Sequence, residues 1–389
     1  MPDPPSHTVP VAIVGGGPVG LFLGICLQKA GVPSLILEQR AAPSSNSRSL
    51  GIHPPALELF KDLGMADQLI SRGVRIKKGH AYSSTGKMGS LSFDSCPPPF
   101  NFILSLPQSQ TEQLLEHELR RLNSQSIIRK ARVTGIKDRN NKVTLTYRTP
   151  EGEHTLRAQY LIGCDGKNSF IRQQAGIPFE GYSYPDTYVM GDFTDNTEFG
   201  TDAAVFLCDE GLIESFPLPD NRRRWVVKTG RYHSSPRRTI IEEAVRQRIS
   251  HSLSHTDHFM LSSFGVQKRI ARPMVQNRLI LAGDAAHVVS PIGGQGMNLG
   301  WLGARQLADC LRTILICDLP GNDLLYRFQQ DQIKAVNNAI ARSEFNMRLG
   351  RKAPFPALRN ATVSWMLLPP FAPLMARLFT MHGLRRWII

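Results

Sequence analysis

The sequence predicts an α/β protein (α+β overall) with a Rossmann-like βαβ domain, an inserted and mainly antiparallel β-sheet domain, and a C-terminal helical segment. Three observations support this prediction. The chain opens with an apolar run that ends in closely spaced glycines, residues 179–230 contain short alternating strands, and residues 361–389 are apolar but interrupted by prolines. At 389 residues, the chain is long enough for about two domains.

The first element is the stretch VPVAIVGGGPVG at residues 9–20. Its small and β-branched apolar residues predict a buried strand. Gly15, Gly17 and Gly20 follow with the spacing that lets a backbone turn approach a pyrophosphate.

The elements after this turn strengthen the same prediction. A helix is expected over residues 21–30, ended by Gly31, and a strand over residues 34–37 leads to Glu38. An acid about twenty residues after the glycines accepts hydrogen bonds from an adenosine ribose. The succession predicts a bound dinucleotide, and a glycine-rich turn in an ordinary α/β domain is the alternative.

The formal net charge of the chain is +14, and the surplus is scattered along it. No nucleic-acid-binding motif accompanies this charge, so we expect no nucleic-acid partner. A basic field attracts anionic dinucleotides or an anionic membrane surface, and a solvated basic face is the simplest interpretation.

The six cysteines form no CxxC pair and no metal-ligand spacing, so we expect no metal site. The first eight residues are polar and proline-rich rather than signal-like, and reduced thiols of a cytoplasmic protein are therefore expected. No apolar run reaches the length of a membrane span.

Periodicity and turn residues place the remaining elements. Helices are expected from Pro55 to a break at Gly64, from about Ser109, over residues 239–253 and over residues 297–316, with a hairpin at 129–147 and buried strands at 160–164 and 278–282. The two buried strands end in Asp165-Gly166 and Gly283-Asp284.

The α/β material is therefore discontinuous along the chain. We expect a nucleotide-binding domain from residues 9–78, 101–178 and 266–345. Residues 79–100 and 179–265 would form a substrate-binding β-sheet domain, and residues 346–389 a C-terminal helical cap.

Three patches stand together in this order: GGGPVG with Glu38, DGKNSFIR at residues 165–172, and GDAAHVVSPIGGQGMNLG at residues 283–300. The combination resembles the single-component FAD-dependent aromatic hydroxylases of the para-hydroxybenzoate hydroxylase class. SRSLGIHPPALELF at residues 47–60 is similar to the polyketide and phenol hydroxylase branch, and LPQSQTEQLL at residues 106–115 is a further match.

The resemblance implies that these patches bind FAD. Gly15, Gly17 and Gly20 would present backbone N–H groups to the pyrophosphate. Glu38 would bind the adenosine ribose, and Asp284 would accept from sugar hydroxyls. The other implied cofactor residues are Arg48 and Gln108, Val133 beside the adenine, Asp165 capping a helix from Gly166, Arg172 supplying charge, and Gly296, Met297 and Asn298 along the flavin ring.

The implied activity is that of a monooxygenase acting on an aromatic or polycyclic molecule, as a monomer or homodimer. NADPH or NADH would reduce FAD, dioxygen would add at the flavin C4a atom, and the resulting hydroperoxide would pass its distal oxygen to the substrate. Arg48 and Pro291 are the catalytic candidates, with the Pro291 carbonyl near the substrate hydroxyl.

Two other functions stay open at this point. One is an epoxidase or hydroxylase of a lipophilic isoprenoid or quinone, and the other is a flavin-dependent reductase. A second GxGxxG motif and a redox cysteine pair are absent from the sequence, which argues against disulfide reductases with two dinucleotide sites.

Two groups of apolar residues bear on the substrate. Phe193, Phe206, Phe216 and Trp225 suit either a flat apolar ligand or an ordinary sheet core. Residues 361–389 mix aromatic and basic side chains and could lie on a membrane surface. Because Pro369 and Pro370 interrupt any extended amphipathic face, we expect a helical cap instead.

Overall fold

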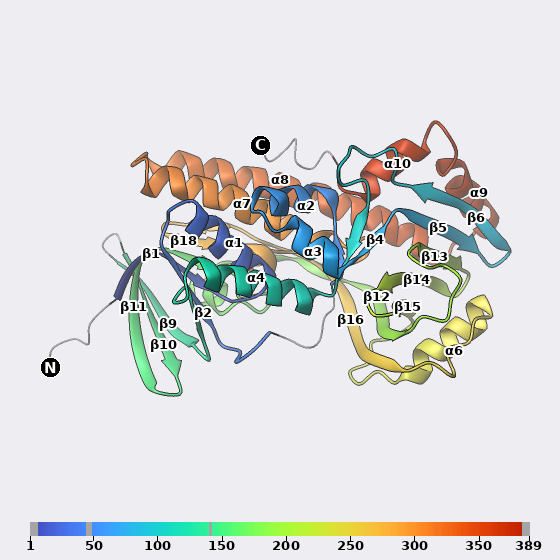
Figure 1. Ribbon diagram of the computed structural model, residues 1–389, viewed down its shortest axis with the longest axis horizontal. Coiled ribbons are helices and arrows are strands. Elements are labelled where there is room, and N and C mark those ends of the chain that lie inside the picture. Colours follow the sequence, from blue (N-terminus) through green and yellow to red (C-terminus); the bar gives the residue numbers. More distant parts are fainter. Residues whose placement is uncertain (1–6, 44–48, 140–141, 383–389) are drawn as a thin grey trace.

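Two eight-stranded sheets organise the chain, one largely parallel and one largely antiparallel (Figure 1). The computed structural model describes residues 7–43, 49–139 and 142–382. The predicted mixed α/β class, with an inserted antiparallel sheet and C-terminal helices, is confirmed.

The first sheet is built around β1 (His7–Val14), which pairs in parallel with β11 (Gly152–Gly163) and β2 (Ser34–Glu38). Its residues Val11 and Ile13 are fully buried, as expected for a parallel strand covered on both faces. The sheet continues through β8 (Ile127–Arg129) on one side and β18 (Leu279–Leu281) and β17 (Val275–Gln276) on the other, and β9 (Arg132–Arg139) and β10 (Lys142–Thr149) extend β11 in antiparallel fashion.

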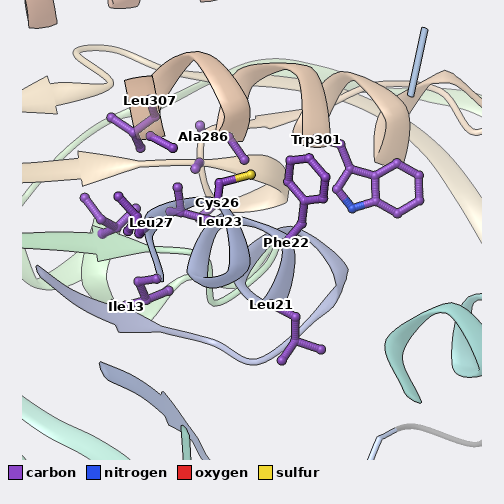
Figure 2. Packing of buried hydrophobic residues seen from close by; sticks show 14 of the residues in the cluster. Ile13, Leu21, Phe22, Leu23, Cys26, Leu27, Ala286, Trp301 and Leu307 are labelled. Atoms are coloured by element: carbon purple, nitrogen blue, oxygen red, sulfur yellow. The ribbon is translucent and has the colours of Figure 1, made fainter. Parts of the chain in front are cut away.

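Helix α1 (Pro18–Lys29) packs against α4 (Gln108–Leu122) and α7 (Gln295–Leu315). Figure 2 shows Phe22 of α1 beside Trp301 of α7, and their ring centroids are 6.3 Å apart. The Trp301 indole N–H also donates to the Pro18 carbonyl at 3.0 Å, which ties α7 to the start of α1. Shorter elements complete this half: α2 (Pro54–Asp62), α3 (Ala66–Arg72), α5 (Phe170–Gln174), the small sheet of β3 (Gly51–Ile52), β7 (Ile103–Ser105) and β4 (Val74–Ile76), and a 3-10 turn at Gly283–Ala285.

The second sheet is antiparallel except where β13 pairs in parallel with β5. Its order is β19 (His287–Val288), β16 (His258–Ala271), β12 (Phe179–Thr194), β15 (Arg222–Thr229), β14 (Gly211–Leu218), β13 (Ala203–Cys208), β5 (Lys78–Ser83) and β6 (Gly86–Ser92). Helix α6 (Arg238–Ile249) covers one face, where Ile241 and Val245 pack with Phe193 and Trp225. Residues on the other face line a cavity.

Helix α8 (Gly321–Gly350) contacts both halves of the molecule and runs along them in Figure 1. Phe328 belongs to the core of the first sheet, whereas Met347, near the other end of the helix, belongs to an apolar cluster on the second. Helices α9 (Pro356–Met366) and α10 (Ala372–Phe379) then lie against β6. Among the described helices, none combines the length and the apolar character needed to cross a bilayer.

Several element boundaries differ from the sequence prediction. Helix α1 begins at Pro18 rather than Leu21, because proline is well tolerated in the first helical turn. The helix expected over residues 239–253 ends at Ile249, since Ser250 takes a left-handed φ of 56°.

Two long elements were not predicted at all. Strand β16 contains the expected domain boundary at residue 265, and α8 contains the expected boundary at residue 345. The residues of β16 do not alternate regularly between buried and exposed, so its sequence lacks a clear two-residue alternation. The division into domains therefore stays a prediction.

The glycine turn gives a first testable prediction. A Cβ atom on Gly20 would lie 2.0 Å from the Gly15 carbonyl oxygen, whereas one on Gly17 would meet nothing within 4 Å. We expect Gly20→Ala to lower the free energy of unfolding by about 3 kcal/mol, because the turn and α1 must separate. Gly17→Ala, the matched control, should stay within about 1 kcal/mol of wild type. Urea unfolding of FAD-free protein measures both, and equal midpoints for the two variants would contradict the packing described.

Candidate active site

A cavity of about 1410 Å³ lies between the glycine turn of the first sheet and the open face of the second sheet. A pocket for one drug-sized ligand is typically about 300–1,000 Å³, so this cavity has room for more than one small molecule. Gly15, Glu38 and Asp165 line one end of it, and Val205, Glu214 and Val226 line the other.

The glycine turn has the shape that a pyrophosphate requires. Gly15 adopts a φ of +108°, and a Cβ there would lie 2.3 Å from the Cys164 carbonyl oxygen, so only glycine fits beside the end of β11. Gly17 faces open space at the first turn of α1. Backbone N–H groups at a helix N-terminus attract anions, and the residues present therefore fit a bound pyrophosphate.

Glu38 ends β2 at the cavity wall, and its residue is only 4% exposed. One carboxylate oxygen accepts from the Gly16 amide at 2.6 Å, and the other accepts from the Arg40 amide at 2.8 Å and from the Arg40 side chain at 3.1 Å. The carboxylate is thereby held at the strand end where the sequence placed it.

Gln108 lines the same end of the cavity, at the start of α4. Its amide donates to Glu112 at 2.8 Å, and the second Glu112 oxygen, Oε2, is buried without a hydrogen bond. Burial raises the pKa of Glu112, and the nearby Arg40 opposes that shift. Sequence reasoning did not single out Glu112, because its burial and its bond to Gln108 are visible only in the structure. Val133, on β9, also lines this end and is 7% exposed.

Asp165 follows β11 and fixes the next loop. Its Oδ2 accepts from the Ile171 amide at 3.0 Å, while Oδ1 is buried and unpaired. Helix α5 begins at Phe170 with Ser169 as its N-cap, so the helix expected from Gly166 starts later. The predicted capping role has a geometric counterpart here, and a role toward the cofactor stays a prediction.

Arg172 points into the protein rather than into the cavity. Its residue is 5% exposed, and its guanidinium donates to the Ala285 carbonyl at 3.0 Å and to the Lys167 carbonyl at 2.8 Å. The guanidinium also lies 3.7 Å from the centre of the Phe179 ring. These contacts favour a supporting role, in which Arg172 joins the two loops that follow β11 and β18.

Asp284 lies in the short turn after β18 and reaches the cavity. Its residue is exposed to the cavity, yet the protein around the carboxyl displaces enough water to raise its pKa to about 6, and the Lys167 charge opposes the shift. A carboxylate whose charged form is poorly solvated gains stability when a ligand hydroxyl donates a hydrogen bond to it. The residue therefore fits the predicted contact with cofactor sugar hydroxyls.

The turn before α7 brings backbone to the cavity. Gly293 and Gly294 have φ values of +89° and +66°, and the Pro291 carbonyl accepts from the Gly294 amide at 2.9 Å. Pro291 lines the cavity, so its carbonyl has one acceptor position used by this turn and one left. Gly296 and Met297 line the cavity in the first turn of α7.

Asn298 is fully buried, and its side chain links loops that are distant in sequence. Its side-chain amide donates to the carbonyls of Gly51 and Gly294, both at 2.9 Å, and its oxygen accepts from the His53 amide at 2.8 Å. The sequence placed Asn298 along the flavin ring and did not predict these side-chain bonds.

His53 lies under the same turn, and burial lowers its pKa to about 4, so its ring is neutral. Its Nδ1 atom is buried without a hydrogen bond. The residue also lines the cavity. Arg48, predicted as both a cofactor and a catalytic residue, lies outside the described residues.

The far wall of the cavity is mainly apolar. Of the four aromatic residues noted in the sequence, Phe216 lines this wall, whereas Phe193, Phe206 and Trp225 belong to the core under α6. Side chains of the C-terminal helices complete the enclosure: Val363, Met366, Leu367, Met375 and Phe379.

Comparison with known proteins places this geometry in context. Residues 8–342 match the protein family described as FAD binding domain. The chain is 30% identical over 344 residues to a Bacillus subtilis protein named uncharacterized aromatic compound monooxygenase YhjG, covering 87% of this chain and 68% of that protein. It is 32% identical over 312 residues to the 12-dehydrotetracycline 5-monooxygenase/anhydrotetracycline 6-monooxygenase of Streptomyces rimosus, covering 76% of this chain and 61% of that protein.

A solved structure shares the whole fold. The crystal structure of p-nitrophenol 4-monooxygenase PnpA from Pseudomonas putida superposes with a TM-score of 0.89 over 97% of this chain and 99% of that one. The two sequences are 21% identical, so this likeness concerns the fold.

Asp284 provides a direct test of the cofactor end. We expect Asp284→Ala to weaken FAD binding by about ten- to a hundredfold, because a charge-assisted hydrogen bond contributes roughly 1.5–3 kcal/mol. Asp209→Ala removes an exposed acid in the β13–β14 turn and serves as the control. Equilibrium dialysis measures the dissociation constants, and equal values for wild type and Asp284→Ala would show that the carboxylate does not contact the cofactor.

Glu214 gives a prediction about stability and pH. Burial raises its pKa from 4.5 to about 7, so the folded protein holds the proton more tightly than the unfolded chain. Wild type therefore loses stability as pH rises from about 4.5 to about 7, and Gln cannot ionise. We expect Glu214→Gln to gain about 1–3 kcal/mol over wild type between pH 4.5 and pH 8, measured by urea unfolding of FAD-free protein. A pH-independent difference would mean that the carboxyl is well solvated.

Proposed function

The chain belongs to this FAD-binding family, and from that premise we propose that it is an NAD(P)H- and dioxygen-dependent monooxygenase that hydroxylates an aromatic or polycyclic small molecule. The observation that carries the proposal is the large cavity, which has the glycine turn at one end and an apolar wall at the other.

The residues present fit a bound FAD. Gly15 and Gly17 leave room for the pyrophosphate. Glu38 would accept hydrogen bonds from a ribose, and Asp284 would accept them from sugar hydroxyls. FAD in this position would supply the reduction of dioxygen and the transfer of one oxygen atom to the substrate.

The chain itself orients the ligands and excludes water. The N-terminus of α7 directs backbone N–H groups of Gly296 and Met297 toward the cavity, where they would stabilise negative charge on a flavin ring. The apolar residues of β13, β14 and β15 would hold a flat substrate away from bulk water.

The sequence has one glycine motif, which would hold one resident dinucleotide, FAD. We therefore propose that NADPH or NADH comes from solution as the electron donor. The excess of basic residues, with a net charge of +14, would attract an anionic nicotinamide cofactor from solution. The six cysteines form no disulfide in the structure, which agrees with a reducing, cytoplasmic environment.

A lipophilic isoprenoid or quinone is the second substrate class that we propose. Its support is the C-terminal cap, which contributes Met366, Leu367 and Met375 to the cavity, because methionine side chains adapt to irregular apolar ligands. Such a substrate would be hydroxylated or epoxidised with the same cofactor.

The decisive experiment follows oxygen and NAD(P)H together. We expect purified protein to bind FAD, and a panel of phenols, polycyclic phenols and quinones to include compounds that stimulate oxygen uptake and NADPH or NADH oxidation. Incorporation of label from isotopically heavy dioxygen into the product, measured by mass spectrometry, identifies a monooxygenase. NAD(P)H oxidation without labelled product across the panel would instead indicate a flavin-dependent reductase, and protein that stays colourless after FAD addition would contradict the proposal.

A further inference from the structure

Glu214 is the one acidic residue that the described part of the second sheet presents to the cavity. It lies in the middle of β14, and the register places Val205 of β13 and Val226 of β15 directly beside it. Both valines line the cavity as well. A carboxyl group therefore stands alone on an otherwise apolar part of the wall.

The carboxyl of Glu214 lacks the partners that a buried acid normally has. The residue is 8% exposed, and no residue of the described ranges hydrogen-bonds with its side chain. Burying a polar group without a hydrogen bond is unfavourable, and burial accordingly raises the pKa of Glu214 to about 7. A ligand that donates a hydrogen bond would relieve this cost.

The neighbouring polar groups do not neutralise Glu214. Arg224 of β15 is held by Asp192 through two hydrogen bonds of 2.6 and 2.8 Å. Tyr188 of β12 has a buried hydroxyl without a hydrogen bond, and its pKa is raised by burial and by the nearby Glu214 charge. Farther along the wall, His80 is bound to Ser90 and Asp202.

These pairings decide which ligands suit this end of the cavity. Arg224, which lines this wall, is already paired with Asp192, so it is not set to offset the repulsion that a substrate carboxylate would meet from Glu214. A hydroxyl group, in contrast, can donate to the carboxylate.

The position of Glu214 also connects it to the cofactor end. Leu212 and Val226, which flank it on the wall, belong to the same apolar cluster as Ile292 in the turn before α7. The apolar wall around Glu214 is therefore continuous with the turn before α7, and both border the same cavity.

We propose that Glu214 selects the substrate by accepting a hydrogen bond from a hydroxyl group of a neutral aromatic or polycyclic molecule, and that it disfavours aromatic carboxylates. This inference rests on the proposed function for the class of ligand, and it narrows that class to phenolic compounds without a negative charge.

Three probes of one shape test the inference: 2-naphthol, 2-methoxynaphthalene and 2-naphthoate. Equilibrium dialysis against FAD-loaded protein without NAD(P)H measures binding at about pH 8, above the pKa of about 7, where ionised Glu214 can only accept. We expect the naphthol to bind wild type about tenfold more tightly than the methyl ether, and the naphthoate to bind most weakly. In Glu214→Leu, the preference for the naphthol over the ether should disappear and the naphthoate should bind more tightly.

Glu214→Gln keeps the shape of the side chain and should retain part of the preference for the naphthol while relieving the exclusion of the naphthoate. Glu210→Gln removes an exposed acid from the same hairpin and should behave like wild type. If the ether binds wild type as tightly as the naphthol, if none of the probes binds, or if Glu214→Leu keeps the wild-type ratios, the inference is wrong. Failure to bind FAD would contradict the proposed function itself, which makes the two failures distinguishable.

Discussion

The close contact between the glycine turn and the end of β11 is the constraint on which the rest of the site depends. Side-chain-free backbone at Gly15 lets the turn approach Cys164, and Gly20 lets α1 approach the turn. The Trp301 bond to Pro18 then fixes α7 against the same point. Because β2, β1, β11 and β18 are parallel and adjacent, their carboxyl ends and the loops after them meet at one edge, as in other nucleotide-binding sheets. Glu38, Asp165 and Asp284 are brought together in this way.

The two sheets contribute different chemistry to one cavity. The parallel sheet supplies loops with backbone N–H groups and carboxylates, which suit a polar dinucleotide. The antiparallel sheet supplies a broad apolar wall with one acid, which suits a ring system with a hydroxyl group. Cap helices α9 and α10 close the space between them. An oxygen-transfer reaction needs both properties, since the cofactor must be held and water must be kept from the reacting atoms.

Much of the cofactor end could be predicted from the sequence, because its signals are local. The glycine spacing, the acid ending β2, and the short turns after β11 and β18 each occupy a few consecutive residues. The roles of Asn298 and Glu214 could not be predicted in this way. Asn298 bonds to Gly51, 247 residues away in the chain. Glu214 has its apolar neighbours Val205 and Val226 only because β13, β14 and β15 pair in the fold. Helix α8 escaped prediction because its apolar residues face two different cores rather than one stripe.

That shared helix has a consequence for how the molecule loses its structure. Phe328 and Met347 lie on α8 but belong to separate cores. If α8 detaches from one sheet, apolar surface of the other sheet is therefore exposed as well. Melting of one half therefore removes support from its neighbour, and we expect the unfolding of the two halves to be coupled through α8. Occupancy of either end of the cavity then protects the whole chain, including segments that the ligand never touches.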